Sequence, residues 1–286
     1  MNNILVTGGK GQLGSELREI APNYKDYNFL FTDVKDLDIT NYPFVAAFVE
    51  SNNITTIINC AAFTAVDKAE SEPDLSDAIN HLAVANFAQI AKEKNIKLIH
   101  ISTDYVFDGT NHKPYVETDI PNPKSVYGQT KLDGELAIQD IKPANSIIIR
   151  TSWVYSKFGN NFVKTMLRLA ETKDEISVVT DQIGSPTNAA DLAKAILNIL
   201  PQISNENVEL FHYSNEGFCS WFDFASAIFE IKGINVKVNK ISTIEYPTAA
   251  KRPYCSFLNK SKLKSKFQVE IPYWRDSLVN CLRTIE

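Results

Sequence analysis

The chain has 286 residues, of which 44% are hydrophobic and 22% are charged, and its formal net charge is −5. This length and composition are typical of a globular protein, either one large α/β domain or a dinucleotide-binding domain with a smaller lobe. The negative charge and the lack of a basic stripe argue against a nucleic-acid partner. No apolar run approaches the roughly 20 residues of a spanning helix, and the N-terminus has no signal-peptide pattern, so we expect no membrane partner.

The cysteines predict reduced thiols rather than a disulfide framework or a metal site. They are widely scattered, contain no C-x-x-C pair and do not cluster with the histidines. Scattered cysteines are usual in the reducing cytoplasm, and a structural zinc site needs closely spaced ligands. The sequence therefore predicts a cytoplasmic protein and identifies no metal ligands. The four residues are Cys60, Cys219, Cys255 and Cys281.

In chain order, short β-branched runs alternate with helical stretches through the first half of the sequence. Strands are predicted at residues 4–7, 29–32, 56–59, 97–102 and 146–150. Helices are predicted between them at residues 12–20, 42–51, 74–94 and 126–140. This alternation is typical of a parallel sheet covered by helices. We therefore predict a Rossmann-type, doubly wound α/β domain over residues 1–155.

The second half predicts a smaller C-terminal α/β lobe over residues 156–286, which binds the substrate. Strands are predicted at residues 177–180, 209–212 and 236–241, and helices at residues 161–173, 188–200 and 220–232. The boundary near residue 155 is approximate, and segments of the lobe can thread back into the first domain. The sequence contains no internal repeat and no low-complexity tract.

A glycine-rich run follows the first predicted strand and opens the first predicted helix. It reads as G-x-G-x-x-G through Gly9, Gly11 and Gly14, or as G-x-x-G-x-x-G through Gly8, Gly11 and Gly14. Glycines in this position permit a tight turn and close approach of the backbone to a pyrophosphate, which the helix N-terminus attracts. The motif predicts a nicotinamide dinucleotide site, because it lies between a strand and a helix. The residues expected to contact the cofactor here are Gly8, Gly11, Gln12 and Leu13.

The end of the second predicted strand bears on the choice between NADH and NADPH. Asp33 lies about 20 residues beyond the glycine run, where an acid accepts hydrogen bonds from the adenosine ribose. Its carboxylate repels a 2′-phosphate and favours NADH, whereas Lys10 attracts that phosphate and favours NADPH. The sequence leaves both cofactors open. Further cofactor contacts are expected after the second and third strands, from Asp38, Ile39, Ala62, Phe63 and Thr64.

Tyr127 and Lys131 are the candidate catalytic pair. They are four residues apart at the start of a predicted helix, so they share one face, and no other tyrosine has a lysine at this spacing. A nearby ammonium lowers the pKa of a tyrosine, which suits Tyr127 as the general acid that protonates an alkoxide after hydride attack. Thr103 follows a predicted strand and is expected to place its hydroxyl against the same oxygen.

Several motifs along nearly the whole chain resemble the dTDP-4-dehydrorhamnose reductase family of extended short-chain dehydrogenases. The blocks that carry the resemblance are Gly8-x-x-Gly11-Gln12-Leu13-Gly14, Asn59-x-Ala61-Ala62-x-Thr64-Ala65-Val66-Asp67, Ser102-Thr103-Asp104-Tyr105-Val106-Phe107, Tyr127-x-x-x-Lys131, Arg150-Thr151-Ser152-Trp153-Val154-Tyr155, Asn161-Phe162-Val163-Lys164, Asp181-Gln182-x-Gly184-x-Pro186-Thr187 and Arg252-Pro253.

The resemblance implies reduction of the 4-keto group of dTDP-6-deoxy-L-lyxo-4-hexulose to dTDP-L-rhamnose by NADPH or NADH. It implies Thr103, Tyr127 and Lys131 as the catalytic set, with Lys131 also holding the nicotinamide ribose and Tyr127 also among the cofactor contacts. It further implies Thr103, Asp104 and Trp153 at the sugar, and Arg252 lies in a matching block with a guanidinium suited to a diphosphate. Some family members carry Mg²⁺ at a dimer contact; a homodimer is therefore an open expectation, and no Mg²⁺ ligands are placed in this sequence.

Two alternatives from other functional classes stay open at this stage. A regulatory relative that binds NADP without catalysis is expected to have a broken Thr/Tyr/Lys set, whereas all three residues are present here. A sugar-nucleotide dehydratase or epimerase retains its cofactor through the cycle, and dehydratases tend to carry two acids after the threonine. Here Asp104 is followed by Tyr105.

Overall fold

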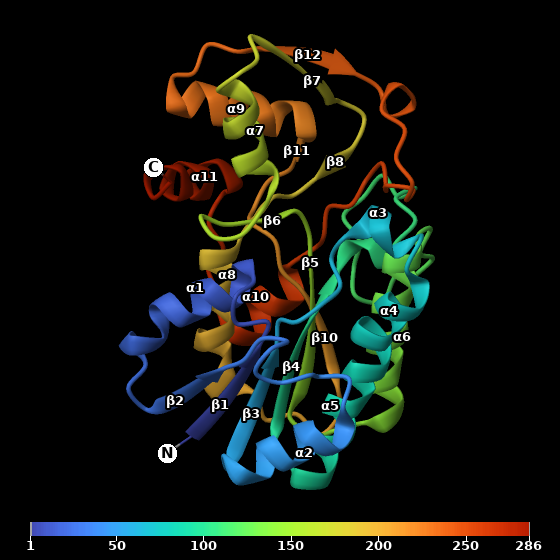
Figure 1. The fold of residues 1–286 in the computed structure, drawn as a ribbon, viewed down its shortest axis with the longest axis vertical. Coiled ribbons are helices and arrows are strands. Elements are labelled where there is room, and N and C mark those ends of the chain that lie inside the picture. The colour runs from blue at the N-terminus through green and yellow to red at the C-terminus, as the bar shows by residue number, and fades with distance from the viewer. Residues whose placement is uncertain (1, 286) are drawn as a thin grey trace.

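The predicted strands of the first half form the core of one parallel sheet in the computed structural model, which describes residues 2–285 (Figure 1). Every neighbouring pair of its six strands is parallel, in the order β10-β5-β4-β3-β1-β2. The strands are β1 (Asn2–Thr7), β2 (Tyr27–Phe31), β3 (Ile54–Asn59), β4 (Lys97–Thr103), β5 (Ser146–Thr151) and β10 (Glu209–His212). The Rossmann-type, doubly wound sheet is confirmed.

Helices cover both faces of this sheet because its strands are apolar on both sides. Ile4 and Val6 point into one apolar layer and Leu5 into the other, as side chains alternate along a strand, and all three are fully buried. The first layer is covered by α1 (Gln12–Ile20), α8 (Ala189–Ile199) and α10 (Ser261–Phe267). The second is covered by α2 (Tyr42–Ser51), α5 (Ala83–Lys94) and α6 (Val126–Ile141).

The continuous helix predicted at residues 74–94 is divided in the structure. It consists of α4 (Pro73–Asp77), one π-helical turn η2 (Ala78–Leu82) and α5. Within η2, the Asn80 side chain accepts a hydrogen bond from the Phe63 nitrogen at 2.9 Å and donates one to the Phe63 oxygen at 3.1 Å. A π turn re-aims a residue within a helix. Here it directs Asn80 to the chain that follows β3.

The second half builds a lobe with its own apolar core. Phe224, Ile228 and Leu278 are fully buried there. Its helices are α7 (Phe162–Ala170), α9 (Trp221–Lys232) and α11 (Trp274–Arg283), and β7 (Glu175–Val179) pairs in parallel with β12 (Lys237–Ile241). Two further pairs are β6 (Val154–Tyr155) with β9 (Thr187–Asn188), and β8 (Ile183–Gly184) with β11 (Cys219–Ser220).

The remaining elements are short, and the chain crosses between the two regions more than once. They are α3 (Val66–Ala69), η1 (Ala21–Asn23), η3 (Asp104–Val106), η4 (Leu200–Gln202) and η5 (Thr243–Glu245). After residue 155, the segments α8, β10 and α10 return to the main sheet, as Figure 1 shows. The boundary at residue 155 stays a prediction. Among residues 2–285, none of the helices has both the length and the apolarity needed to cross a bilayer.

Candidate active site

The turn between β1 and α1 is a cradle of backbone with no room for side chains. Gly8 has a φ of +64°, and a Cβ there would lie 2.8 Å from the Ala61 nitrogen. A Cβ on Gly14 would lie 2.2 Å from the Gly8 oxygen, so α1 begins directly against the turn. The N-cap of α1 is Gly11, which has no side chain that could cap the first N–H groups of the helix. The free N–H groups and dipole of this helix end favour an anionic group such as a phosphate.

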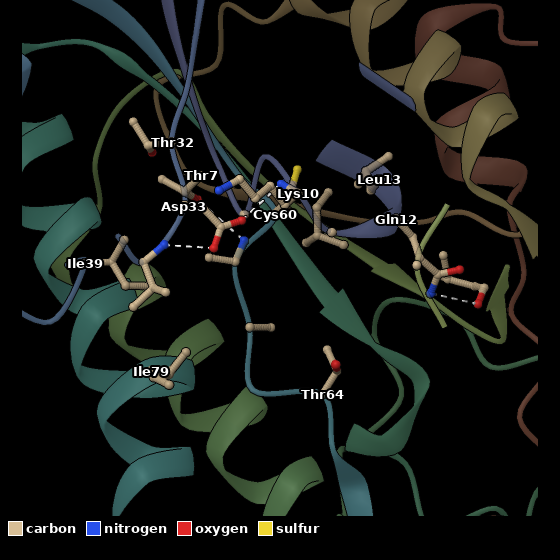
Figure 2. A pocket seen from close by; sticks show the side chains of 18 of the residues that line it. Thr7, Lys10, Gln12, Leu13, Thr32, Asp33, Ile39, Cys60, Thr64 and Ile79 are labelled. Carbon is tan, nitrogen blue, oxygen red and sulfur yellow. Dashed lines mark hydrogen bonds between the residues drawn. The ribbon is translucent and has the colours of Figure 1, made fainter. Parts of the chain in front are cut away.

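A cavity of about 830 Å³ lies beside this cradle, at the C-terminal ends of the strands. The strand β2 lies on one side of β1, and the chain then crosses to β3 on the other side of β1. Ligands of doubly wound sheets bind where the strand order reverses in this way. In Figure 2, Asp33 and Ile39 lie on one side of the cavity and Gln12 and Leu13 on the other. The predicted residues that line it are Gly8, Gly11, Gln12, Leu13, Asp33, Asp38, Ile39, Ala62, Thr64, Tyr127 and Lys131.

Phe63 is the predicted cofactor residue that does not line this cavity. Both of its backbone groups are held by the Asn80 side chain. Sequence reasoning also missed wall residues from the second half of the chain, Gly159, Asn160 and Leu192. Gly159 and Asn160 reach the site because Asn161 donates a hydrogen bond to Gln12 Oε1 at 3.0 Å. The sequence carried no local signal for a contact that joins positions so far apart.

The Asp33 carboxylate is fixed at the cavity by two backbone donors. Its Oδ2 accepts a hydrogen bond from the Lys10 nitrogen at 3.1 Å, and its Oδ1 accepts one from the Val34 nitrogen at 2.8 Å. The Gly9 nitrogen also donates to the Thr32 oxygen at 2.8 Å, so the glycine turn and the end of β2 are tied together. The Lys10 side chain is exposed. One carboxylate therefore both braces the glycine turn and faces the cavity.

Tyr127 is placed by the first turn of α6, which has several independent attachments. The Ser125 hydroxyl caps the helix by accepting from the Gly128 nitrogen at 3.1 Å, and Glu70 Oε1 accepts from the Val126 nitrogen at 2.8 Å. A Cβ on Gly128 would lie 2.3 Å from the Tyr105 oxygen, so α6 packs directly against η3. This close packing brings Tyr127 next to the residues that follow β4.

The environment of Tyr127 differs from the sequence-based expectation. Burial raises the pKa of Tyr127 to about 12, the nearby Thr103 side chain lowers it in part, and Asp104 raises it. The pKa is therefore raised by burial and not lowered as predicted, and Lys131 Nζ is bonded to the Ile101 oxygen rather than to the phenol. A buried phenol with a raised pKa keeps its proton at neutral pH, and an alkoxide is a stronger base than a phenolate. Tyr127 is therefore still able to act as a proton donor.

Lys131 is buried between α6 and the sheet. Its Nζ donates to the Ile101 oxygen at 2.7 Å and lies 3.2 Å from His100 Nε2. Burial lowers the pKa of Lys131 to about 8, while Glu135 and Cys60 raise it. Lys131 therefore changes charge close to neutral pH. It does so at the wall of the cavity, which it lines.

Asp104 carries a buried carboxylate oxygen that lacks a partner. Its Oδ1 accepts from the Thr103 hydroxyl at 3.1 Å, whereas its Oδ2 has no hydrogen bond among the described residues, although Ser256 lies nearby. Burial raises the pKa of Asp104 to about 6. A buried acceptor without a partner is costly in a folded protein, and a hydroxyl group of a ligand would satisfy it.

The other predicted site residues, Thr103, Asp104, Trp153 and Arg252, lie outside the residues that line the cavity. The Trp153 indole stacks on Trp221 with ring centroids 3.5 Å apart, and its backbone has a φ of +48°, which a tryptophan rarely adopts. Arg252 makes a bidentate ion pair with Asp67, with Nη1 to Oδ1 at 2.9 Å and Nη2 to Oδ2 at 2.7 Å. Because a guanidinium has five N–H donors, this pairing leaves donors for another anion.

The described residues contain one group with the spacing of metal ligands, Asp77, His81 and Asp133. His81 Nδ1 and Asp77 Oδ1 are 2.9 Å apart, so these two side chains satisfy each other. The four cysteines are free thiols, as predicted.

Comparisons with known proteins agree over the whole length of the chain. The family model described as the RmlD substrate binding domain matches residues 1–286. A dTDP-4-dehydrorhamnose reductase of Aggregatibacter actinomycetemcomitans is 41% identical over 290 residues, which cover 98% of each protein. The structure of a dTDP-4-dehydrorhamnose reductase from Clostridium acetobutylicum is similar with a TM-score of 0.93, 42% identity and 98% coverage of both chains. That of the Bacillus anthracis reductase in complex with NADP has a TM-score of 0.94, 40% identity and 99% coverage of both chains.

Proposed function

The chain belongs to the RmlD substrate-binding domain family, that of the dTDP-4-dehydrorhamnose reductases, and from this premise we propose that it reduces dTDP-4-dehydro-L-rhamnose to dTDP-L-rhamnose. The carbonyl carbon of the sugar gains a hydride, the carbonyl oxygen gains a proton, and NADPH or NADH is oxidised. The observation that carries this proposal is the position of Tyr127 and Lys131 on the wall of a cavity that begins at a glycine cradle.

The cavity fits a nicotinamide dinucleotide because one end of it is lined by the backbone of the glycine turn at the start of α1, where an anionic group is favoured. A side chain at Gly8 or Gly14 would collide with backbone atoms, and the α1 N-terminus faces the same turn. In this proposal the glycine turn holds the pyrophosphate and Asp33 faces the adenosine ribose. Lys131 binds the nicotinamide ribose with its ammonium. When bound, the cofactor supplies the hydride, and the chain supplies orientation and the proton.

Tyr127 is the proposed proton donor to the carbonyl oxygen. Its phenol is protonated at neutral pH because burial raises its pKa, and so it carries the proton that the reduced oxygen needs. The Thr103 hydroxyl lies beside the phenol and donates to Asp104 Oδ1 in the free chain; it is proposed to turn this proton to the carbonyl oxygen when the sugar binds. In that role it stabilises the negative charge that develops there as the hydride arrives. Thr103 ends β4 and Tyr127 lies in the first turn of α6, and the Gly128 contact packs α6 against η3, the turn that directly follows Thr103.

The proposed substrate contacts are inferred from hydrogen-bonding groups that lack a partner in the free chain and from one strained backbone position. The buried Asp104 Oδ2 is suited to accept a hydrogen bond from a sugar hydroxyl. Strained backbone conformations are often found at binding sites, and the positive φ of Trp153 supports a place for it near the sugar. Arg252 is proposed to bind the diphosphate with the donors that Asp67 leaves free. The proposed ligand of this part of the site is a nucleotide sugar. That the protein forms a homodimer and that it is located in the cytoplasm stay predictions.

Mixing the purified protein with NADPH and the 4-keto sugar nucleotide tests this proposal. We expect one NADPH to be oxidised for each dTDP-L-rhamnose formed, followed by absorbance of the cofactor and chromatography of the sugar nucleotide. A dehydratase or epimerase would form product without net oxidation of the cofactor, and a regulatory NADP-binding protein would form none. Either result would contradict the reductase assignment.

Cofactor choice gives a second prediction, because Asp33 and Lys10 act in opposite directions. Asp33→Asn removes the charge that repels a 2′-phosphate and keeps one of the two acceptor oxygens for the backbone. We expect the ratio of kcat/KM for NADPH to that for NADH to rise by about 10-fold, since hydrogen bonds to charged groups contribute about 1.5–3 kcal/mol. Lys10→Ala should change the ratio in the opposite direction and by less, because its side chain is exposed and screened.

Lys35 is the matched control for these two variants. It is an exposed lysine just beyond β2 that does not line the cavity, so Lys35→Ala should leave the cofactor ratio unchanged. If neither Asp33→Asn nor Lys10→Ala alters the ratio, these side chains do not discriminate between a 2′-hydroxyl and a 2′-phosphate on the adenosine ribose.

A further inference from the structure

The indole of Trp153 is covered on both of its faces. One face stacks on Trp221, with ring centroids 3.5 Å apart and an interplanar angle of 8°. A Cβ added to Gly184 would lie 2.5 Å from Cε2, 2.7 Å from Cζ2 and 2.8 Å from Nε1 of the same indole. A point that is closer to a ring-fusion carbon than to its neighbours lies over the ring, and Trp221 fills the first face, so Gly184 covers the second. The part of the ring that remains open to a ligand is therefore an edge.

The backbone around Trp153 is fixed to the segment that follows Gly184. Trp153 has a φ of +48°, which a tryptophan rarely adopts and which persists only where the surrounding contacts over-determine it. The Ser152 hydroxyl donates to the Ser185 oxygen at 2.7 Å, and the Thr187 nitrogen donates to the Trp153 oxygen at 3.1 Å. These two hydrogen bonds hold the indole over the Gly184 backbone.

The two covers of the indole come from neighbouring elements of the second-half lobe. Gly184 ends β8, which pairs in antiparallel register with β11, and β11 runs directly into Trp221, the first residue of α9. Ser220 caps this helix in a capping box with Asp223, which fixes its first turn. Phe162 packs against Trp221, with ring centroids 4.6 Å apart. The spacing between Trp221 and Gly184, which together form an indole clamp, is thus set by strand pairing and helix capping.

The indole clamp is bonded to the segment that faces Asp104. The Ile183 nitrogen donates to the Tyr254 oxygen at 2.7 Å, and the Ser256 nitrogen donates to the Ile183 oxygen at 2.9 Å. The Ser256 side chain lies near the carboxyl group of Asp104, whose free Oδ2 is the proposed acceptor for a sugar hydroxyl. A bonded path therefore runs from the residue before Gly184 to the proposed sugar site.

We propose that Trp221 and Gly184 are positioning residues, which present the Trp153 indole edge-on to the sugar of the nucleotide sugar. This inference deepens the proposed function and rests on it for the place of Trp153 at the sugar. The polar group of an indole is the N–H on its edge, which acts only as a donor. Trp153 therefore recognises a sugar oxygen through Nε1–H and does not stack a ring face on the sugar. Position 184 requires glycine, because a side chain there would displace the indole.

Comparison of dTDP-L-rhamnose with dTDP isolates the contribution of the sugar to binding. Both dissociation constants are measured by titration calorimetry in the presence of NADPH, with which the reduced sugar does not react. The quantity compared between variants is the dissociation constant of dTDP divided by that of dTDP-L-rhamnose, called the sugar ratio. A change that affects only the nucleotide, the cofactor or the stability of the lobe leaves the sugar ratio unaltered.

Trp153→Phe keeps an aromatic ring in the indole clamp but removes the N–H donor. It should lower the sugar ratio about fivefold, which is the usual effect of one neutral hydrogen bond. Trp221→Leu and Gly184→Ala should lower it to a similar extent, the first by uncovering the indole and the second by pressing a methyl group against it. Trp221→Phe preserves a flat cover and should restore most of the sugar ratio.

A double variant tests whether Trp221 acts through Trp153. If it does, Trp153→Phe combined with Trp221→Leu should lower the sugar ratio no further than Trp153→Phe alone, because the second change has no donor left to misplace. A Trp221 that contributed to the sugar site independently of Trp153 would add its own loss to that of Trp153→Phe.

Trp274→Leu is the matched control, because Trp274 belongs to the same apolar core but packs its ring against Phe224. It should leave the sugar ratio unchanged. The proposal is wrong if Trp221→Leu and Gly184→Ala leave the ratio unchanged, if Trp274→Leu lowers it as much, or if the losses in the double variant add. It is also wrong if the sugar adds no affinity in the unsubstituted protein. If the ratio responds as expected but the 4-keto sugar is not reduced, the proposed function fails while the positioning role stands.

Discussion

Turnover of the 4-keto sugar should fall by about 10²-fold or more when Tyr127 is replaced by phenylalanine, which is the usual contribution of a general acid. The ring and its packing are kept: Tyr127 meets Tyr105 edge-on with ring centroids 5.5 Å apart. Only the proton donor is removed, so the dissociation constant of NADPH should change little. The measurement is steady-state oxidation of NADPH at neutral pH, combined with cofactor fluorescence for binding.

Tyr105→Phe is the control for this substitution. Tyr105 lies beside Tyr127 and is largely buried but does not line the cavity, so loss of its hydroxyl should cost far less turnover. Near-normal turnover of Tyr127→Phe would remove Tyr127 from the role of proton donor. The mechanism would then need another acid, and the buried carboxyl group of Asp104 is the nearest candidate, because its pKa is raised to about 6.

The largest expected effect on stability comes from the buried ion pair between α6 and β5. Arg150 Nη2 is 2.6 Å from Glu135 Oε2, Arg150 Nε is 2.9 Å from Glu135 Oε1, and both side chains are at most 3% exposed. The Ser102 hydroxyl also donates to Glu135. Glu135→Leu would leave a buried guanidinium without its counter-ion, so the free energy of unfolding should fall by about 3–5 kcal/mol. Urea unfolding followed by circular dichroism measures this loss.

A double variant shows whether the loss of unfolding free energy is caused by the buried Arg150 guanidinium that has no counter-ion. Glu135→Leu combined with Arg150→Met replaces the ion pair by apolar side chains, and such replacements are often nearly neutral for stability. We therefore expect the double variant to be more stable than Glu135→Leu alone. A loss below about 1 kcal/mol in the single variant would show that water or another group compensates Arg150.

Local patterns were sufficient for the first half of the fold and for the cofactor cradle. Helix α1 and helix α2 have the predicted bounds, because apolar spacing, and for α2 also the Asn41 cap, are apparent within a few residues of sequence. The glycine run was equally readable, since a positive φ at Gly8 and the close approach at Gly14 both require glycine. Helix α11 was missed although Trp274, Leu278 and Cys281 have helical spacing, whereas the short, lysine-rich α10 offers almost no such signal.

Features that depend on distant contacts could not be predicted in this way. The π turn η2 exists where Asn80 binds the backbone of Phe63, 17 residues earlier. The ion pair of Arg252 with Asp67 joins positions that are 185 residues apart, and nothing in either local sequence indicates it. The fold also decides which second-half residues reach the cavity, because α8 packs its apolar face onto the same layer as α1.

By itself, the sequence determined the class of the sheet, the phosphate-binding turn and the pairing of Tyr127 with Lys131 on one helix face, because each depends on spacing within a short stretch of chain. The tertiary structure alone decided the electrostatic state of that pair. The sequence predicted that Lys131 lowers the pKa of Tyr127, but burial raises this pKa to about 12 and Lys131 is bonded to His100 and Ile101 instead. The pKa of an ionisable group depends on how much water the fold removes from it and on which hydrogen-bond partners and charges replace that water. Both are set by contacts between distant parts of the chain, so a local sequence pattern does not contain them.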